Sequence, residues 1–126
     1  MLDQSALVRF ASGTNVAVGE LVGEVADEKA LIGVPVSSAA LAQASLSTSE
    51  QRAMFALLVD RNPSVVILPM LAEERRFIGE YTADLGRRLE LAHAVREARR
   101  NQAQLATTEG DVVRKAFGEM YGIVDL

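Results

Sequence analysis

Short apolar runs alternate with amphipathic segments along the whole chain. Runs that are rich in β-branched residues and too short for a helix predict strands at residue 2 and at 31–36, 64–69, 103–106 and 123–125. Apolar residues spaced three and four apart predict helices over 5–12, 16–28, 37–46, 47–61 and 108–120, and two more within 71–101. Strands separated by helices favour a parallel sheet. We therefore expect an α/β fold, with a mainly parallel central sheet of about five strands and helices on both faces.

Turn and capping residues support these boundaries. Pro35 is expected at the end of its strand, and a break near Gly86 is expected to separate the two helices within 71–101. Helix N-caps are predicted at Ser37 and Ser38, at Ser47 with Glu50, and at Thr108 with Asp111.

Composition narrows the class of protein. The chain has 126 residues, of which 49% are hydrophobic, so we expect one domain over residues 1–126. It contains no cysteine, which excludes disulfides and thiolate chemistry and favours the cytoplasm. No apolar run approaches the length of a membrane span, and we expect no signal peptide. The net charge of −4 disfavours strong non-specific binding to nucleic acids.

Asp3 and Ser5 form the first candidate site. Asp3 ends the first apolar run and Ser5 opens the next helix, which places a carboxylate at the C-terminal edge of a strand, where open α/β sheets bind ligands. The alternative is local, with Ser5 as an N-cap and Asp3 as an acid favoured by the helix dipole.

The order of elements and three segments resemble a PIN domain, the fold of metal-dependent ribonucleases that includes the toxin half of many bacterial toxin–antitoxin pairs. The segments are Leu-Asp-Gln-Ser-Ala-Leu at 2–7, Leu-Ala-His-Ala-Val-Arg-Glu-Ala-Arg at 91–99 and Leu-Ala-Thr-Thr-Glu at 105–109. The resemblance implies a site of three or four acids that hold Mg²⁺ or Mn²⁺, which activate water and neutralise the scissile phosphate.

Only part of that acidic site is present. By resemblance Asp3 matches the first acid, and Glu109 matches the fourth, with Asp111 close by as a further metal ligand. These three are the expected ligands, and Asp3 and Glu109 are the expected catalytic residues.

We expect the other positions of the resembled site to contact substrate. Two of them have lost the carboxylate. Ser5 matches a small hydroxyl residue, Gln43 stands in place of a glutamate, and Arg88, preceded by Arg87, stands in place of the third acid. A shift in register is an alternative, in which Asp84 or Glu90 supplies the missing acid.

The two arginines flank the apolar stripe of their helix at about 30° and 70° from its centre. A guanidinium in the cleft would repel a cation and could pair with Asp3 or Glu109, replacing the metal as the neutralising charge. In the alternative, both arginines extend into solvent.

Other chemistries have less support. His93 lies about 150° from the same stripe, so an exposed, non-catalytic role is expected, with no Ser-His-acid arrangement around it. Most arginines in the second half are expected to be solvated and paired with acids, and an RNA-binding patch is the alternative.

The sequence therefore favours a degenerate PIN-like domain with lost or impaired nuclease activity, acting as an RNA- or protein-binding module. No cofactor is expected in this case. The alternative is an active Mg²⁺- or Mn²⁺-dependent endoribonuclease toxin with an antitoxin-like protein partner. The resemblance also implies a homodimer, for which Met54, Phe55 and Leu58 are a candidate surface; the alternative is that all three pack inside the domain.

Overall fold

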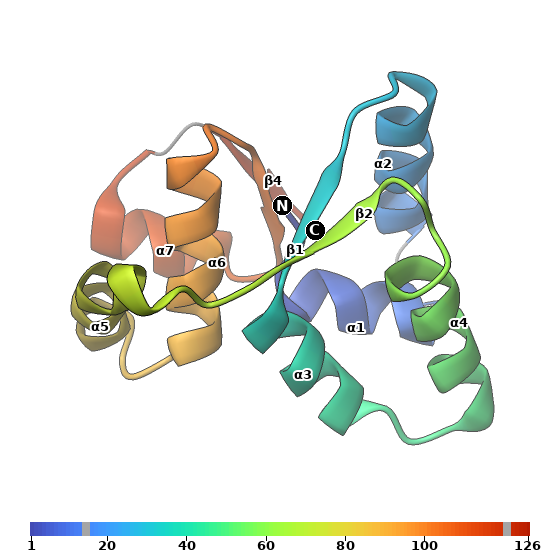
Figure 1. Cartoon of the computed structure of the whole chain (residues 1–126), viewed down its shortest axis with the longest axis horizontal. Helices are drawn as coiled ribbons and strands as arrows, with labels where there is room; N and C mark the ends of the chain where they lie inside the picture. The colour runs from blue at the N-terminus through green and yellow to red at the C-terminus, as the bar shows by residue number, and fades with distance from the viewer. Residues whose placement is uncertain (14–15, 120–121) are drawn as a thin grey trace.

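The computed structural model describes residues 1–13, 16–119 and 122–126, and most of these residues are helical (Figure 1). In chain order the elements are α1 (Gln4–Ser12), α2 (Val16–Asp27), β1 (Ile32–Pro35), α3 (Val36–Ser45), α4 (Ser49–Val59), β2 (Val65–Leu68), the 3-10 helix η1 (Ala72–Glu74), α5 (Arg75–Asp84), α6 (Leu89–Arg100), β3 (Leu105–Thr107), α7 (Gly110–Phe117) and β4 (Ile123–Asp125). The predicted alternation of short apolar segments and helices is therefore present. Met120, expected on the apolar side of the last helix, lies outside the described residues.

The prediction of a central five-stranded sheet is wrong. The described residues form two small parallel sheets, β1 with β2 and β3 with β4, whose strands have three or four residues each. The expected first strand is reduced to an isolated bridge between Leu2 and Ala106, while the Leu2 N–H donates to the Gly33 carbonyl at 3.0 Å. A strand cannot extend further here because Asp3 already caps α1. The N-terminal residues thus connect the two sheets, with one backbone hydrogen bond to Gly33 and two to Ala106.

Strand β2 is an edge strand bounded by two prolines. Among the described residues it pairs only with β1, in a register that matches Val34 with Ile67. Its middle residues, Val66 and Ile67, are 39% and 38% exposed. Pro63 and Pro69 flank the strand, as the sequence predicted for the apolar run at 64–69.

Several helices begin one or two residues from the predicted position. Helix α3 follows Pro35 directly, which places Ser37 and Ser38 in its first turn and leaves it without a side-chain cap. The capping box of α4 uses Thr48 with Gln51 rather than Ser47 with Glu50. The N-cap of α7 is Glu109 rather than Thr108. The break at Gly86 is confirmed, since α5 ends at Asp84 and α6 begins at Leu89.

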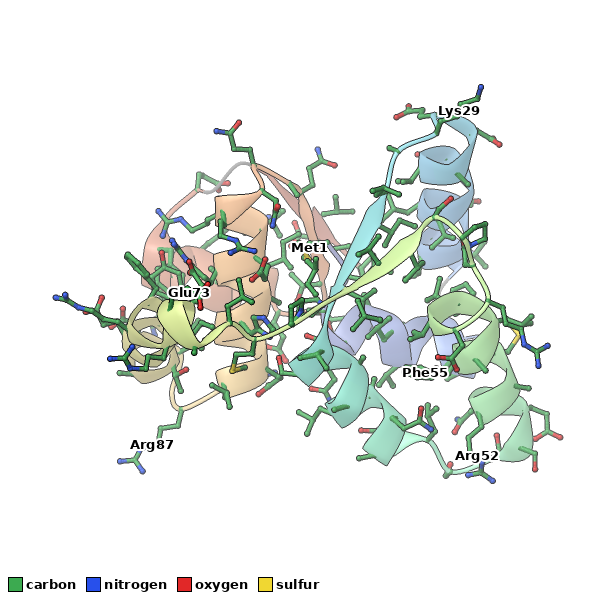
Figure 2. All side chains as sticks on the ribbon, in the orientation of Figure 1. Met1, Lys29, Arg52, Phe55, Glu73 and Arg87 are labelled. Carbon is green, nitrogen blue, oxygen red and sulfur yellow. The ribbon has the colours of Figure 1, made fainter. Side chains whose placement is uncertain are left out.

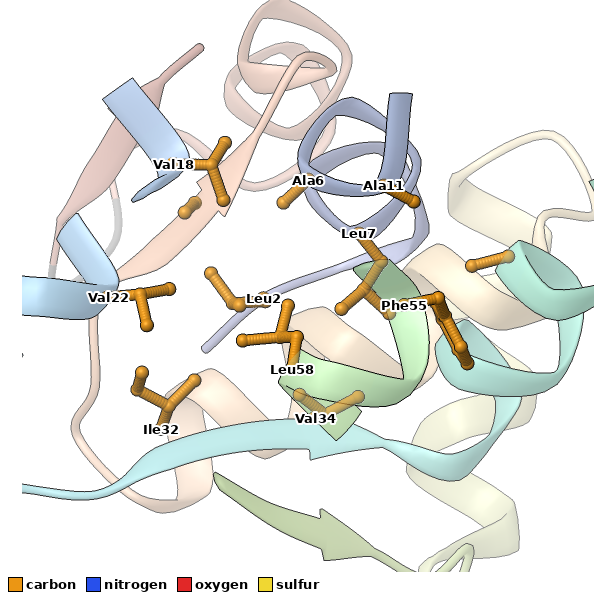
Figure 3. Packing of buried hydrophobic residues seen from close by; sticks show 12 residues of the cluster. Leu2, Ala6, Leu7, Ala11, Val18, Val22, Ile32, Val34, Phe55 and Leu58 are labelled. Carbon is orange, nitrogen blue, oxygen red and sulfur yellow. The ribbon is translucent and has the colours of Figure 1, made fainter. Parts of the chain in front are cut away.

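Two apolar clusters form the core. The first lies between α1, α2, α4 and β1, where Leu2, Leu7, Val34 and Leu58 point toward one another (Figure 3). The second surrounds α6, which packs against α3, α5, β1 and β3. Because neighbours cover α6 from several directions, its residues from Leu91 to Val95 are all buried.

Leu58 in the first cluster offers a direct test of this packing. Leu58 is 1% exposed, whereas Leu31, which precedes β1, is 70% exposed. We expect Leu58→Ala to lower the free energy of unfolding by about 2–5 kcal/mol through lost burial and a residual cavity. Leu31→Ala should stay within about 0.5 kcal/mol of the unmodified chain. Urea unfolding followed by circular dichroism measures both, and equal effects would contradict this packing.

Candidate functional site

Asp3 is a buried N-cap whose oxygens are both occupied by donors from the chain. It is 3% exposed. Oδ1 accepts hydrogen bonds from the Ala6 N–H at 3.0 Å and the Ser5 hydroxyl at 2.6 Å, and Oδ2 accepts one from the Thr107 hydroxyl at 2.5 Å. Asp3 therefore caps α1, a role that the sequence argument gave to Ser5, and attaches this helix to β3.

The hydroxyls around Asp3 extend this network to the start of α7. Thr107 Oγ1 accepts a hydrogen bond from the Glu109 N–H at 2.9 Å, and Ser5 Oγ accepts one from the Thr108 N–H at 2.9 Å. The sequence argument did not select Thr107. The sequence feature that could have identified Thr107 is a hydroxyl residue at the carboxyl end of the β3 segment. This position faces the start of α1.

Burial controls the charge of Asp3. Removal from water raises the pKa of this carboxyl above its ordinary value of 3.8, although the hydrogen bonds from Ser5, Thr107 and Ala6 act in the opposite direction. Each carboxylate oxygen is already hydrogen-bonded to the protein, so these donors would compete with a metal ion for the lone pairs of Asp3.

Arg88 binds the second predicted acid, Glu109. Arg88 Nη1 lies 3.1 Å from Glu109 Oε1, and Arg88 Nε donates to Glu90 Oε1 at 2.9 Å. Burial alone would lower the pKa of Arg88, but the bonds to Glu90 and Glu109 outweigh it and raise the pKa above its ordinary value. The guanidinium thus neutralises the carboxylate that was expected to hold a metal.

The remaining predicted site residues lie on the surface. Arg87 adopts a left-handed backbone conformation with φ +68° and extends away from the molecule (Figure 2). Gln43 is exposed on α3, and the exposed Asp111 pairs with Arg114 at 3.5 Å. The structure brings Asp3, Ser5, Glu109 and Arg88 together, but not these three.

The arrangement does not fit a magnesium or manganese site. Asp3 is hydrogen-bonded on both oxygens, Glu109 is paired with Arg88, and Asp111 faces solvent. Within residues 1–13, 16–119 and 122–126, no group of three or more acids or histidines is placed to hold a metal ion.

A polar cleft of about 300 Å³ lies beside this network. Its lining residues are Gln4, Ser5, Val8, Arg9, Ser45, Arg88, Thr108 and Glu109. Two of them are arginines and most of the others carry hydroxyl or amide groups, which suits a phosphate or another small oxyanion better than a cation.

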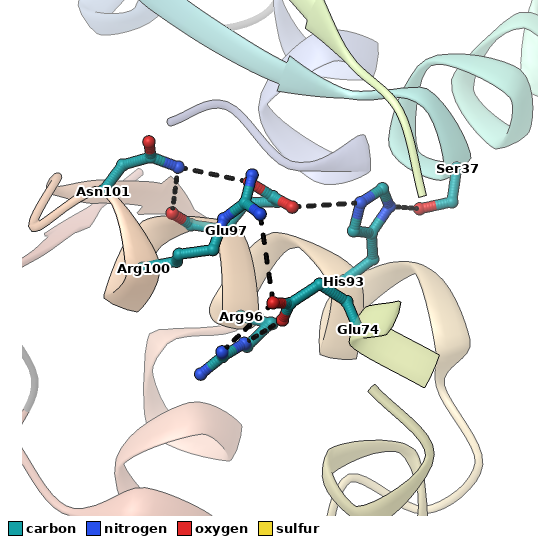
Figure 4. Close-up of polar contacts among 7 residues, drawn as sticks. All are labelled: Ser37, Glu74, His93, Arg96, Glu97, Arg100 and Asn101. Carbon is teal, nitrogen blue, oxygen red and sulfur yellow. Dashed lines mark hydrogen bonds and ion pairs between the residues drawn. The ribbon is translucent and has the colours of Figure 1, made fainter. Parts of the chain in front are cut away.

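A second polar cluster contradicts the predictions made for His93. The side chain of His93 is fully buried rather than exposed, because α6 is covered on more than the side that its apolar stripe marks. It lies in a row with Ser37 and Glu97 (Figure 4): Ser37 Oγ is 2.7 Å from His93 Nδ1, and His93 Nε2 is 3.7 Å from Glu97 Oε1. A Ser-His-acid arrangement therefore exists, although the sequence argument excluded it.

Burial also controls the charge of His93. It lowers the pKa of the imidazole below the ordinary value of 6.5, and the opposing effects of Glu97 and the Pro69 backbone do not offset it. His93 is therefore neutral at pH 7 and has a lone pair available on one ring nitrogen.

The raised pKa of Asp3 predicts how stability depends on pH. The folded chain holds the Asp3 proton more tightly than the unfolded chain, in which the carboxyl has its ordinary pKa of 3.8. Relative to Asp3→Asn, the unmodified chain should be most stable below pH 3.8 and should lose stability as pH rises through the raised pKa. Urea unfolding of both chains between pH 3 and pH 7 measures this difference; a difference that grows with pH would show that the pKa is lowered instead.

Comparisons of the chain with family models, with curated proteins and with solved structures found no match. Among the described residues no helix is long and apolar enough to cross a membrane. The network around Asp3 and Arg88 and the cluster around His93 are therefore the candidate functional sites.

Proposed function

We propose that this chain is a PIN-like binding module that has lost metal-dependent nuclease activity. The observation that carries the proposal is the 3.1 Å contact between Arg88 and Glu109. It puts a fixed positive charge at the position that matches the third acid of the resembled site, beside Glu109, which matches the fourth. A divalent cation would meet repulsion from the guanidinium and would have to compete with it for Glu109.

The polar cleft is the proposed binding surface, and the RNA backbone is the proposed ligand. Arg88 has 35% of its side chain exposed despite its two ion pairs, and Arg9 lines the same cleft. Arginine forms paired hydrogen bonds with phosphate oxygens, and Ser5 and Thr108 supply further polar groups at the rim. The modest number of cations predicts weak, salt-dependent binding rather than a tight complex.

RNA binding without cleavage is the expected result. A short labelled single-stranded RNA should show an anisotropy increase with the unmodified chain and should stay intact in Mg²⁺ or Mn²⁺. Arg88→Ala should weaken binding roughly tenfold or more, because a hydrogen bond to a charged group contributes about 1.5–3 kcal/mol. The slope of log affinity against log salt concentration should decrease by about one, as expected for the loss of one phosphate contact.

Arg87→Ala is the matched control, since Arg87 neighbours Arg88 in sequence but extends away from the molecule (Figure 2) and does not line the cleft. It should leave RNA affinity nearly unchanged. Equal losses in both variants would reject the cleft as the binding surface. Metal-dependent cleavage that stops in Asp3→Asn would establish the alternative, an active endoribonuclease.

We also propose a homodimer, with a smaller surface than the sequence suggested. Phe55 and Leu58 pack in the core at 4% and 1% exposure, so they are unavailable for a partner. Met54 and Leu57 remain exposed at 39% and 50%, and they lie one turn apart on α4.

A dimer through α4 predicts a defined change in mass. Light scattering at tens of micromolar should give twice the chain mass of 13.6 kDa for the unmodified chain. Leu57→Glu should give the mass of a single chain, because a charge would be buried without a partner. Glu50→Gln, on the same helix, is a control that removes a charge and should keep the dimer. A single-chain mass for the unmodified protein would remove the homodimer from the proposal.

A further inference from the structure

Ser37, His93 and Glu97 come from two helices and meet at the carboxyl end of β1. Ser37 lies in the first turn of α3, directly after that strand, whereas His93 and Glu97 lie one turn apart on α6. Ser37 is half-buried, while both α6 side chains are fully buried. We propose that Ser37 is a nucleophile activated by His93, and that it accepts acyl groups from carboxylic esters with a short apolar acyl chain.

We assign the imidazole proton of His93 to Nε2 from the contacts of its two ring nitrogens. Within the described part of the chain, His93 Nε2 and Glu97 Oε1 are buried and have no hydrogen-bond partner, and they face each other at 3.7 Å. A proton on Nε2 points toward the carboxylate and stabilises this pair. The lone pair of Nδ1 then faces the Ser37 hydroxyl at 2.7 Å, so the serine donates and His93 accepts.

Glu97 is held in position by its other oxygen. Arg100 Nη2 donates to Glu97 Oε2 at 3.2 Å, and Asn101 Nδ2 donates to the same oxygen at 3.1 Å (Figure 4). Arg100 in turn lies 3.9 Å from Glu74, which also binds Arg96. These contacts leave Oε1 directed at His93, so Glu97 is a positioning residue in this proposal.

The start of α3 offers a site for a developing oxyanion. The first N–H groups of a helix have no acceptor within it, and α3 has no side-chain cap because its N-cap is Pro35. The side chain next to Ser37 also lacks a partner: the Ser38 hydroxyl is fully buried and has no hydrogen-bond partner among the described residues. Backbone N–H groups next to a nucleophile are the usual means of stabilising a tetrahedral intermediate.

Exposed apolar side chains close in sequence to Ser37 and His93 favour an apolar acyl group. Leu41 lies one turn after Ser37 on α3 and is 42% exposed; Leu89 lies one turn before His93 on α6 and is 47% exposed. Met70, 38% exposed, follows Pro69, whose backbone acts on the pKa of His93. An aliphatic chain would cover these residues, whereas a charged acyl group would find no partner among them.

The reaction balances without a cofactor. Ser37 Oγ attacks the ester carbonyl carbon as its proton moves to His93 Nδ1, and the carbonyl electron pair moves onto oxygen. When the intermediate collapses, the bond to the alcohol oxygen breaks and the alcohol takes the proton from His93, leaving acyl-Ser37. Water then attacks this ester, its proton passes through His93 to Ser37 Oγ, and the carboxylic acid is released.

Covalent labelling and turnover test the proposal. A fluorophosphonate probe should modify Ser37, which is identified by mass spectrometry of the peptide, and p-nitrophenyl butyrate should be hydrolysed with a burst of p-nitrophenol. Ser37→Ala should abolish both. Ser49→Ala is the matched control and should leave both signals unchanged, because Ser49 is an exposed serine at the start of α4, outside the Ser37 cluster and the cleft at Arg88.

Variants of α6 separate activation from structure. His93→Gln should lower kcat by roughly 10²–10⁴-fold, the usual contribution of a general base, and circular dichroism checks that the variant is folded. The charged groups that act on His93 are Glu97 and Arg100, both on α6, and they oppose one another. The rate should fall on acidification with a midpoint below pH 6.5. Glu97→Gln should move that midpoint lower still, because Glu97 raises the pKa of His93.

Three results would overturn the proposal: no labelling of Ser37 above the level of Ser49, labelling that persists after heat denaturation, or a folded His93→Gln variant with unchanged rate. Because Ser37 and His93 do not line the cleft at Arg88, these results are independent of those for RNA binding.

Discussion

The buried carboxylate of Asp3 is the interaction on which the arrangement around the N-terminus depends. It must satisfy its lone pairs inside the protein, and it does so with donors from its own helix and from Thr107 at the end of β3. This requirement fixes the start of α1, limits the N-terminal backbone to a single bridge, and joins segments more than 100 residues apart. A carboxylate used in this way stabilises structure, and any ligand would compete with its internal donors.

Arg88 has the complementary effect on Glu109. The helix α6 begins directly after Arg88, so the position of its backbone is set by the helix, and its guanidinium reaches two acids of different segments. In this way a site that resembles a cation site in sequence becomes a set of internal ion pairs with one polar cleft beside it. The proposed change from metal binding to anion binding needs no change in the order of the helices.

Local patterns predicted the helices well, because an apolar stripe is a property of one segment. The sheet and the buried polar cluster were predicted poorly, because both depend on contacts between distant segments. Residue 2 was expected to be part of a strand, and no feature of its own sequence shows that Asp3 ends the pairing. His93 was placed on the exposed side of α6 by its angle from one stripe, but helices and strands cover α6 from several directions. At the candidate site, the pairing of Arg88 with Glu109 was anticipated as one possibility. Three further residues were placed at this site by resemblance alone and lie outside it: Arg87, Gln43 and Asp111.

The prolines that flank β2 determine how far another chain can pair with its open edge. Proline has no backbone N–H, so Pro63 and Pro69 cannot donate to a neighbouring strand. An added strand could be held along Val65–Leu68 only, over four residues. Edge pairing of this length is too short to be stable by itself, which protects the apolar Val66 and Ile67 from growing into an extended intermolecular sheet.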